Sequence, residues 1–315
     1  MTGYAAALAT ALIWAAYPVA TRAGVTGDFS PLDLIALRFG VGTLLFLPYL
    51  ALQHASISRD TWRRGVPLAL FQGAGMAALV VCGLQFAPAN HAAALGPGVA
   101  PAWVVLLGAL VFGRRPSLRA AGGAALCAAG VLLLAGWSAS TDPRVLLGDA
   151  MFVAASGLGA LYVLQMRRWN IGTPAGAAIV TFYSALVVVP WHLSSGDGAL
   201  LAASPAALAW QVLWQGVLIG CVALVTLNHA IERLGPERSS ALVALVPALS
   251  ALLSFVFLGE VPAGPEIAGI VAISAGVLIG AARATAAARP PAAPPRTAPP
   301  AGYPVPDSAP GTSQR

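Results

Sequence analysis

The chain has 315 residues, of which 58% are hydrophobic and only 9% are charged, and its formal net charge is +6. A soluble domain carries about 25% charged residues, because water must wet its folded surface. The composition therefore argues against a soluble enzyme, a soluble nucleic-acid-binding protein and a secreted disulfide scaffold, and it predicts an integral membrane protein.

Ten apolar runs in the sequence are long enough to cross a bilayer as helices, which takes about 20 mostly apolar residues each. Some runs begin with a helix-start signal, such as Ser30-Pro31 followed by Asp33. The period-2 alternation that a membrane β-barrel needs is absent from the sequence. We predict an all-α integral membrane protein with ten transmembrane helices, at residues 4–21, 31–51, 65–86, 90–112, 118–137, 148–166, 174–193, 206–228, 237–258 and 264–282.

The arginines predict the orientation, because cytoplasmic loops of membrane proteins carry an excess of basic residues. If the N-terminus is cytoplasmic, only Arg22 and Arg144 fall in outer loops, whereas ten arginines fall in the inner loops and four in the C-terminal region. We predict a multi-pass protein of the cytoplasmic membrane with both termini in the cytoplasm. Residues 283–315 are rich in proline and alanine, and we predict a disordered cytoplasmic tail there.

The two halves of the sequence resemble each other. Residues 92–135 align with 238–281 at a constant offset of 146, and the alignment keeps proline and glycine positions in register. Earlier segments align at slightly smaller offsets. The paired residues include Pro31 with Pro174, Tyr17 with Tyr162, Gln72 with Gln215, Pro101 with Pro247, and Gly113 with Gly259.

Each half contains five predicted spans, so the second copy enters the membrane in the opposite orientation to the first. We predict two inverted-topology repeats, at residues 3–137 and 148–282. Inverted repeats supply two related states that open to opposite sides, which is what alternating access requires. The repeat therefore favours a transporter over a scaffold protein.

Interruptions of the predicted fourth span indicate a candidate substrate site. In inverted-repeat transporters, spans that glycine and proline interrupt at corresponding positions point to the binding site. A proline removes a backbone donor, which only protein or cavity water can compensate inside a membrane. The alternative is a kink that serves packing. The residues concerned are Gly96, Pro97, Gly98 and Pro101, with Pro247 in the middle of the corresponding ninth span.

Arg38 is the one charged side chain well inside a predicted span, about 10 Å deep at 1.5 Å per residue. A buried arginine is costly in a membrane and usually faces a cavity or a partner. Its planar guanidinium suits a carboxylate, so we predict that it anchors an anionic group of the substrate. Alternatively, it extends to the outer interface or bonds backbone carbonyls.

Further candidates for the substrate site are polar or aromatic: Trp14, Tyr17, Gln72, Tyr162 and Gln215. The glutamines equally suit hydrogen bonds between helices, and the aromatic residues equally suit anchors near the membrane interface.

Other titratable residues receive a structural interpretation. Asp149 and Glu266 lie at the starts of predicted spans, where an acid favours the helix dipole. His91 lies near a span end, and we do not assign it to a proton relay. Because no Asp or Glu lies at mid-span, a carboxylate relay through the core is disfavoured.

Catalytic and metal-binding patterns are missing from the sequence. It contains no HExxH, GxSxG or Walker-type loop, and no cluster of carboxylates and histidines with ligand spacing. The three cysteines lie singly in apolar runs. We predict no enzyme activity, no cofactor, no metal and no nucleic-acid partner. The expected partners are a small-molecule substrate and the lipid bilayer, and the sequence does not identify a coupling ion.

Three segments resemble the drug/metabolite transporter superfamily, and specifically proteins with two EamA domains. They are ALIWAAYPVATRAG in the first span, SPLDLIALRFG at the second and GPERSSALVALVPALSALLSFVFLGEVP across the ninth. The resemblance covers about residues 3–282 and implies ten helices in two inverted halves around a central cavity. Arg38 and Glu260 match positions of the family, whereas Gly113-Arg114 departs from its Gly-Glu pattern.

We therefore predict a secondary transporter that moves a small polar or amphipathic metabolite across the cytoplasmic membrane by alternating access. An amino-acid-like substrate and export are the favoured reading. The alternative is a channel-like or lipid-handling membrane protein on the same scaffold.

Overall fold

The computed structural model describes all residues except 1, 112, 114, 196–198, 235–244 and 282–315. The described residues form helices joined by short connections, without a strand among them. The predicted tail, 283–315, lies outside the described residues. So does the first part of the predicted ninth span, 237–258, up to residue 244.

The first half of the chain contains α1 (Gly3–Val25), α2 (Pro31–Gln53), α3 (Arg59–Gln72), α4 (Ala74–Phe86), α5 (Ala89–Leu95), α6 (Ala100–Leu110) and α7 (Leu118–Thr141). The second half contains α8 (Pro143–Arg168), α9 (Thr173–Ser195), α10 (Ala199–Ala202), α11 (Pro205–Gln211), the π-helix η1 (Val212–Val222), α12 (Ala223–Leu234), α14 (Val246–Leu258) and α15 (Gly264–Ala281).

Eight helical segments within the described ranges are long and apolar enough to cross a membrane, and α14 and α15 are shorter apolar helices. Each predicted span falls on one of these ten segments, so the predicted all-α membrane fold is confirmed. The boundaries differ in places, because hydropathy alone does not detect polar first turns. Thus α3 begins at Arg59 rather than at residue 65, and α8 begins at Pro143 rather than at residue 148.

The helix starts follow from local chemistry. The Ser30 hydroxyl accepts a hydrogen bond from the Asp33 amide at 3.2 Å, and the Asp33 carboxylate accepts one from the Ser30 amide at 2.7 Å. This capping box satisfies two backbone donors at the start of α2, and Pro31 supplies the fixed φ of the first turn. The predicted start signal is therefore confirmed here.

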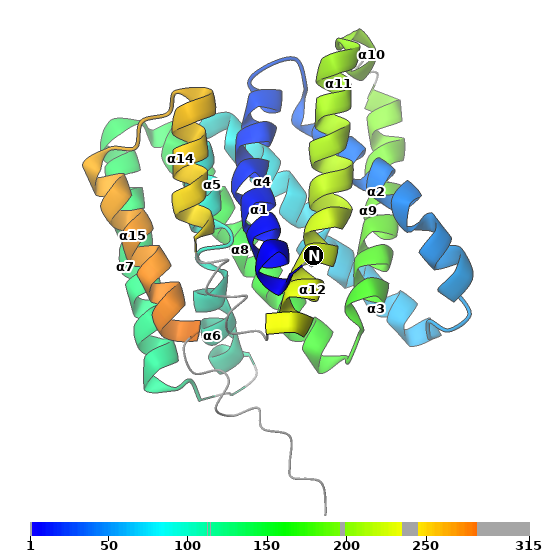
Figure 1. The fold of residues 1–315 in the computed structure, drawn as a ribbon, viewed down its shortest axis with the longest axis horizontal. Helices are drawn as coiled ribbons and strands as arrows, with labels where there is room; N and C mark the ends of the chain where they lie inside the picture. The colour runs from blue at the N-terminus through cyan, green and yellow to red at the C-terminus, as the bar shows by residue number, and fades with distance from the viewer. Residues whose placement is uncertain (1, 112, 114, 196–198, 235–244, 282–315) are drawn as a thin grey trace, which may run out of the picture.

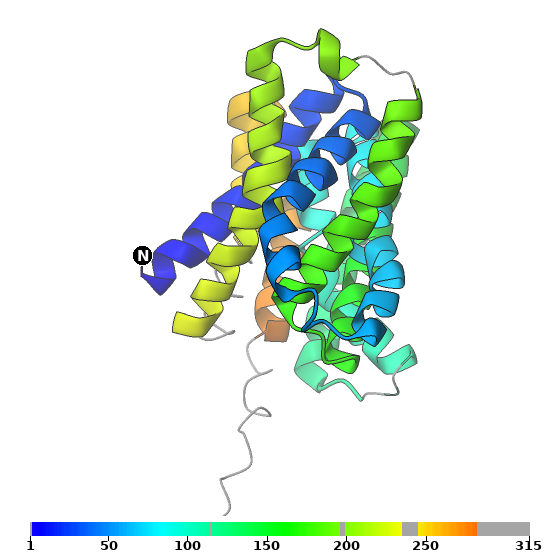
Figure 2. The same cartoon turned by 90° about the vertical axis from the view of Figure 1, so that its right-hand side faces the viewer.

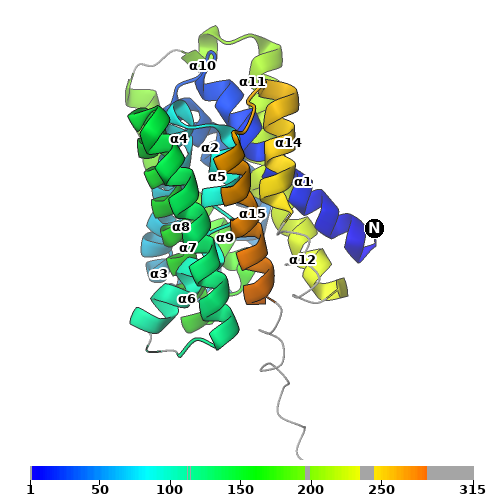
Figure 3. The same cartoon turned by 90° about the vertical axis from the view of Figure 1, so that its left-hand side faces the viewer.

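Small residues let α7 and α15 approach closely and antiparallel (Figures 1 and 3). A Cβ built on Gly123 would lie 2.5 Å from the Gly276 carbonyl oxygen, and one built on Gly130 would lie 2.7 Å from the Gly269 carbonyl oxygen. The sequence alignment pairs Gly123 with Gly269 and Gly130 with Gly276. Exchanging the two halves therefore converts the Gly123–Gly276 contact into the Gly130–Gly269 contact, as inverted repeats require.

The same exchange relates two further contacts. A Cβ on Gly73, between α3 and α4, would clash with the Ser184 hydroxyl of α9, and a Cβ on Gly216, in η1, would clash with Val41 of α2. At an offset of 143, Gly73 aligns with Gly216 and Val41 aligns with Ser184, so the two contacts are equivalent. Each half thus distorts its third helix at an equivalent glycine, by a break in one half and a π-helix in the other. The repeat boundaries at 3–137 and 148–282 stay a prediction.

Interior packing joins helices of both halves. One apolar cluster includes Leu84, Leu95, Phe152 and Ile273, from α4, α5, α8 and α15. A second cluster joins α2, α4 and α9. Since lipid tails are as apolar as leucine, tight packing and interhelical hydrogen bonds hold such helices together rather than the hydrophobic effect.

The connections between helices gather at two ends of the molecule (Figures 1 and 2). We call one the arginine-rich end; the α2–α3 and α8–α9 connections lie there, beside Arg59, Arg63, Arg64, Arg167 and Arg168. We call the other the acidic end; the α1–α2, α4–α5 and α14–α15 connections lie there, beside Asp33, Asp149, Glu260 and Glu266.

Candidate functional site

The fourth span is interrupted where the sequence predicts. Helix α5 ends at Leu95 and α6 begins at Ala100, and Gly96 between them has φ −82° and ψ −96°. The Ser156 hydroxyl of α8 donates a 2.7 Å hydrogen bond to the Gly96 carbonyl. Another helix therefore satisfies a carbonyl at the interruption, as a membrane interior demands.

The paired prolines occupy first turns of helices. Pro101 follows Ala100 at the start of α6, and Pro247 follows Val246 at the start of α14. Pro247 therefore does not lie mid-helix in the described part of the ninth span, because α14 begins only one residue before it. A proline is tolerated in a first turn, whose amide has no partner inside the helix. Pro97 and Pro101 are exposed, whereas Gly96, Gly98 and Pro247 are buried.

Arg38 of α2 lies against Tyr17 of α1. Its Nη1 donates a 2.9 Å hydrogen bond to the Tyr17 hydroxyl, and its Cζ lies 5.5 Å from the centre of the Tyr17 ring. Tyr17 is buried, and Arg38 is half-buried. Arg38 forms no ion pair with any residue that the structure describes. A guanidinium has five N–H donors, so most of them stay available to an anion.

A polar chain continues from Tyr17 along α1. The Thr21 hydroxyl donates to the Tyr17 carbonyl at 2.8 Å, and the Gln215 amide group donates to the Thr21 hydroxyl at 3.0 Å and to Gln211 Oε1 at 3.3 Å. Gln215 is fully buried, and its Oε1 has no hydrogen-bond partner among the described residues. A buried carbonyl of this kind can accept a bond from a ligand amine.

The other predicted site residues lie in different surroundings. Trp14 packs on a cluster from α1, α5 and α14, and Tyr162 packs on one from α3, α8 and α9. The Gln72 Oε1 lies near Gly159 of α8. Among the described residues, none of these three side chains bonds to Arg38 or Tyr17. The structure therefore brings Arg38 to Tyr17 and brings Gln215 to Thr21 on the same helix, α1. Gln72 and Tyr162 lie where α3 meets α8, the helices equivalent to η1 and α1.

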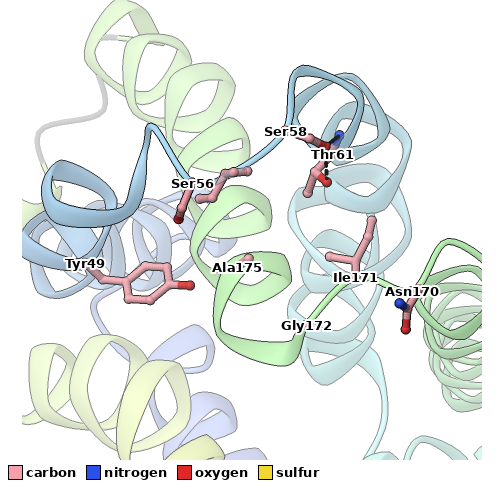
Figure 4. A pocket seen from close by; sticks show the side chains of 9 residues that line it. Tyr49, Ser56, Ser58, Thr61, Asn170, Ile171, Gly172 and Ala175 are labelled. Carbon is pink, nitrogen blue, oxygen red and sulfur yellow. Dashed lines mark hydrogen bonds between the residues drawn. The ribbon is translucent and has the colours of Figure 1, made fainter.

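Two hollows of about 250 Å³ each lie near the surface of the helix bundle. The first is at the arginine-rich end, between the end of α2, the start of α3 and the α8–α9 connection. Figure 4 shows Tyr49 and Ser56 on one side of it and Ile171 and Asn170 on the other. The second is an apolar groove between α1, η1 and α14, edged by Trp210 and Trp214. Arg38 lines neither hollow, so the central cavity between the two halves stays a prediction.

Sequence reasoning missed an ion-pair network at the acidic end. Arg22 of α1 pairs through Nε with Glu260 of the α14–α15 connection. Its Nη1 donates to the carbonyl oxygens of Leu84 at 2.7 Å and Ala87 at 2.6 Å, and Glu260 accepts from the Ala89 amide at 3.0 Å. The network thus fastens the first helix and the α4–α5 connection to the second half.

A histidine between two carboxylates lies at the same end. His91 of α5 is fully buried; its Nδ1 lies 2.8 Å from Asp149 Oδ1 of α8, and its Nε2 lies 3.2 Å from Glu266 Oε1 of α15. Glu266 also accepts from the Ala263 amide at 2.8 Å, as a first-turn acid does. Asp149, however, is not at a helix start, because Asp142 caps α8 and Pro143 opens it. The interpretation of Asp149 as a first-turn acid was therefore wrong. The Asp142-Pro143 pair before the apolar run was the sequence signal that marked the true helix start.

Comparisons with known proteins agree with this architecture. The model of the EamA-like transporter family matches residues 1–136 and again residues 146–280. The "Probable terminal-alkyne amino-acid exporter" of Streptantibioticus cattleyicolor is 26% identical over 283 residues, which cover 86% of this chain and 90% of that protein.

Two proteins of Salmonella typhimurium are similar as well. The "Threonine/homoserine exporter RhtA" is 28% identical over 271 residues, covering 82% of this chain and 81% of that one. The "Probable amino-acid metabolite efflux pump" is 26% identical over 290 residues, covering 87% and 92%. A solved crystal structure superposes with a TM-score of 0.57 at 20% identity, over 88% of this chain and 96% of that one, which shows a shared fold.

Proposed function

Since this chain belongs to the EamA-like transporter family, it is a multi-pass membrane transporter and not an enzyme, and we propose that it exports an amino-acid-like metabolite by alternating access. The relevant membrane is the cytoplasmic one. The arginine-rich end faces the cytoplasm and the acidic end faces outward, as the excess of arginines in one set of loops favours.

The surroundings of Arg38 are the observation that supports an amino-acid-like substrate. A charged side chain in a membrane helix costs about 2.5–3.5 kcal/mol on insertion scales, and this one has no carboxylate partner among the described residues. Its unused donors suit a substrate carboxylate, and the unpartnered Gln215 Oε1 suits a substrate ammonium group. Arg38 bonds the Tyr17 hydroxyl, and Gln215 bonds the Thr21 hydroxyl one helical turn further along α1.

The names of the relatives support the same class. Three similar proteins are named as exporters or efflux pumps of amino acids or amino-acid metabolites. An α-amino acid carries both a carboxylate and an ammonium group, which are the two groups that Arg38 and Gln215 would bind. We therefore infer a zwitterionic amino acid as substrate.

The arrangement of contacts supports alternating access. Both the Arg22–Glu260 pair and the His91 contacts join the two halves, and they lie at the acidic end. This arrangement fits a state that is closed at the acidic end. The equivalent distortions at Gly73 and Gly216 offer each half a place to bend when the opposite state forms.

The experiment reconstitutes the purified protein in liposomes loaded with unlabelled L-threonine and follows uptake of labelled L-threonine from the bath. We expect saturable counterflow, because a carrier exchanges substrate across the membrane one molecule at a time. Empty liposomes serve as the control, and a panel of other labelled amino acids ranks the substrates. Flux that rises linearly with concentration would indicate a channel, and no flux of any amino acid would contradict the proposal.

The apolar groove between α1, η1 and α14 favours a lipid-handling function as the second candidate. Alanine, valine, leucine and tryptophan side chains line it, and the Trp210 and Trp214 rings lie 5.6 Å apart at its edge. Movement of fluorescent phospholipids between the leaflets of the same liposomes, without amino-acid counterflow, would support this candidate instead.

A further inference from the structure

One side of α3 carries two arginines followed by two apolar residues. Arg59, Arg63, Val66 and Leu70 are spaced four, three and four residues apart, which places them on the same side of a helix. We call these four residues the α3 outer face. All four are exposed in the helix bundle, Val66 by 57% and Leu70 by 60%. Because α3 begins at the arginine-rich end, the arginines lie near the membrane surface and the apolar residues lie deeper.

The opposite side of α3 packs against the rest of the protein. Gly65, Leu68 and Ala69 are buried there, and a Cβ built on Gly65 would clash with Ile179 and Tyr183 of α9. Figure 3 shows α3 at the margin of the bundle. The α3 outer face therefore points away from the interior, towards the lipid around the protein.

The two arginines of the α3 outer face lack a counter-charge. In the parts of the chain that the structure describes, neither Arg59 nor Arg63 forms an ion pair or a side-chain hydrogen bond. Asp60, the only acid in α3, pairs instead with Arg64 at 2.6 Å. Like charges one helical turn apart repel each other, so an anion placed between Arg59 and Arg63 would stabilise both.

Aromatic side chains beside the arginines are typical of the headgroup level of a membrane. The Trp62 ring lies edge-on to the rings of Phe182 and Tyr183, with centroids 5.9 and 6.0 Å apart. Tryptophan and tyrosine are enriched where membrane and water meet. Arg59 and Arg63, which flank Trp62 in the sequence, are therefore at the depth of lipid phosphates.

The shape of the α3 outer face selects among anions. A guanidinium binds a phosphate through two parallel hydrogen bonds, but a soluble phosphate would use only the arginines. A phospholipid also has acyl chains, which run from the headgroup towards the bilayer centre. Leu70 lies about 10 Å deeper than Arg63 along the helix, which is within one leaflet of a hydrocarbon core about 30 Å thick. Acyl chains would therefore cover Val66 and Leu70.

We propose that the α3 outer face binds an anionic phospholipid, with the headgroup phosphate between Arg59 and Arg63 and the acyl chains on Val66 and Leu70. A zwitterionic lipid is disfavoured, because its own ammonium group is repelled by the arginines. This lipid is a bound partner of α3 and not a transported molecule. The inference does not depend on the proposed transport, since these four residues lie outside the site around Arg38.

The test uses the purified full-length protein in a neutral detergent. Native mass spectrometry measures how much phosphatidylglycerol or phosphatidylcholine binds, with identical acyl chains in the two lipids. Hydrogen bonds to charged groups predict that phosphatidylglycerol binds about 10-fold more tightly or better. Equal affinity for the two lipids would overturn the proposal.

Substitutions then locate the bound lipid. The double variant Arg59→Gln/Arg63→Gln should lose the preference for phosphatidylglycerol, and Arg63→Lys should keep part of it, because the charge remains without the fork. Arg119→Gln is the matched control: Arg119 is also exposed in the first turn of a helix, α7, but Gly122 follows it one turn later. The control should bind as the wild type does. An equal loss in Arg119→Gln, or no loss in the double variant, would show that α3 is not the site.

A last comparison separates a lipid from a free anion. Inorganic phosphate at millimolar concentration should not displace phosphatidylglycerol, because it makes no apolar contact. Val66→Ser/Leu70→Ser should weaken phosphatidylglycerol binding while Arg59 and Arg63 remain. Displacement by phosphate, or unchanged binding in this variant, would assign the arginines to a soluble anion and contradict the lipid site. These readouts involve no transport, so failure of either proposal leaves the other standing.

Discussion

At the residue scale, the two repeats differ where the proposed site lies. An offset of 143 places Thr181 of α9 at the position equivalent to Arg38. The first repeat therefore carries a cation at this position, and the second carries a hydroxyl. The backbone of Thr181 accepts a 3.2 Å bond from Thr43, which is a packing contact between α2 and α9. A site with one cation can orient an asymmetric ligand, which two equivalent arginines would not do.

Removing the Arg38 guanidinium should therefore weaken substrate binding, and with it transport, while the protein still inserts into the membrane. Hydrogen bonds to charged groups contribute about 1.5–3 kcal/mol each, which corresponds to a loss of affinity of roughly 10- to 100-fold. We expect Arg38→Ala to raise the KM for threonine counterflow by at least this factor. Arg38→Lys should recover only part of the loss, because an ammonium lacks the bidentate fork.

The control for this variant is Arg59→Ala, which removes an exposed arginine at the start of α3. Counterflow kinetics over a range of threonine concentrations separate KM from the maximal rate. An unchanged KM in Arg38→Ala would remove Arg38 from the substrate site.

At the element scale, glycine positions set how closely the helices pack. Gly113 and Gly259 end equivalent helices with φ of 62° and 68°, a left-handed conformation that favours glycine. Gly123 and Gly130 instead allow α7 to approach α15 until backbone meets backbone. The first pair explains why the helices stop where they do, and the second explains which helices become neighbours.

A single methyl group at the α7–α15 contact should destabilise the protein. Gly123→Ala would place a Cβ 2.5 Å from a backbone oxygen that cannot move alone, and such overpacking costs about 1–3 kcal/mol. Gly122→Ala is the matched control: Gly122 is exposed on the same helix, and a Cβ there would meet nothing within 4 Å.

Thermal denaturation of both variants in the same detergent measures the difference. We expect a lower Tm for Gly123→Ala and an equal or slightly higher Tm for Gly122→Ala, since alanine is the better helix former by roughly 0.5–1 kcal/mol. Equal Tm values for the two variants would contradict the close contact of α7 with α15.

At the scale of the whole molecule, exchange of the two halves relates helices that run in opposite directions. Helices α7 and α15 are equivalent in sequence and pack antiparallel, and so do α2 and α9. Equivalent connections therefore lie at opposite ends of the molecule. The α1–α2 connection is at the acidic end, and its counterpart between α8 and α9 is at the arginine-rich end.

Single cysteines in these connections should label from opposite sides of the membrane. In a background with Cys82, Cys127 and Cys221 replaced by alanine, Thr26→Cys should react with an impermeant maleimide on intact cells. Gly172→Cys should react only after the membrane is permeabilised. Both positions are exposed, so the reagent can reach them. Labelling of both from the same side would disprove the inverted arrangement.

The sequence by itself determined the number and type of spans, the pairing of the halves and the family. These follow from signals along the chain: apolar run length, arginine bias, and prolines and glycines repeated at a fixed offset. The sequence also proposed Arg38, Tyr17 and Gln215 separately as site residues, the first from the cost of a charge in lipid and the others from their counterparts in the opposite half.

Only the tertiary structure decided which of these residues meet. His91 lies 58 positions from Asp149 and 175 positions from Glu266 along the chain, so no local pattern could connect them. Their contact arises because inverted packing places α5 beside both α8 and α15. Likewise, a half-buried arginine of α2 and a fully buried glutamine of η1 both bond side chains of α1, because α1, α2 and η1 pack against one another.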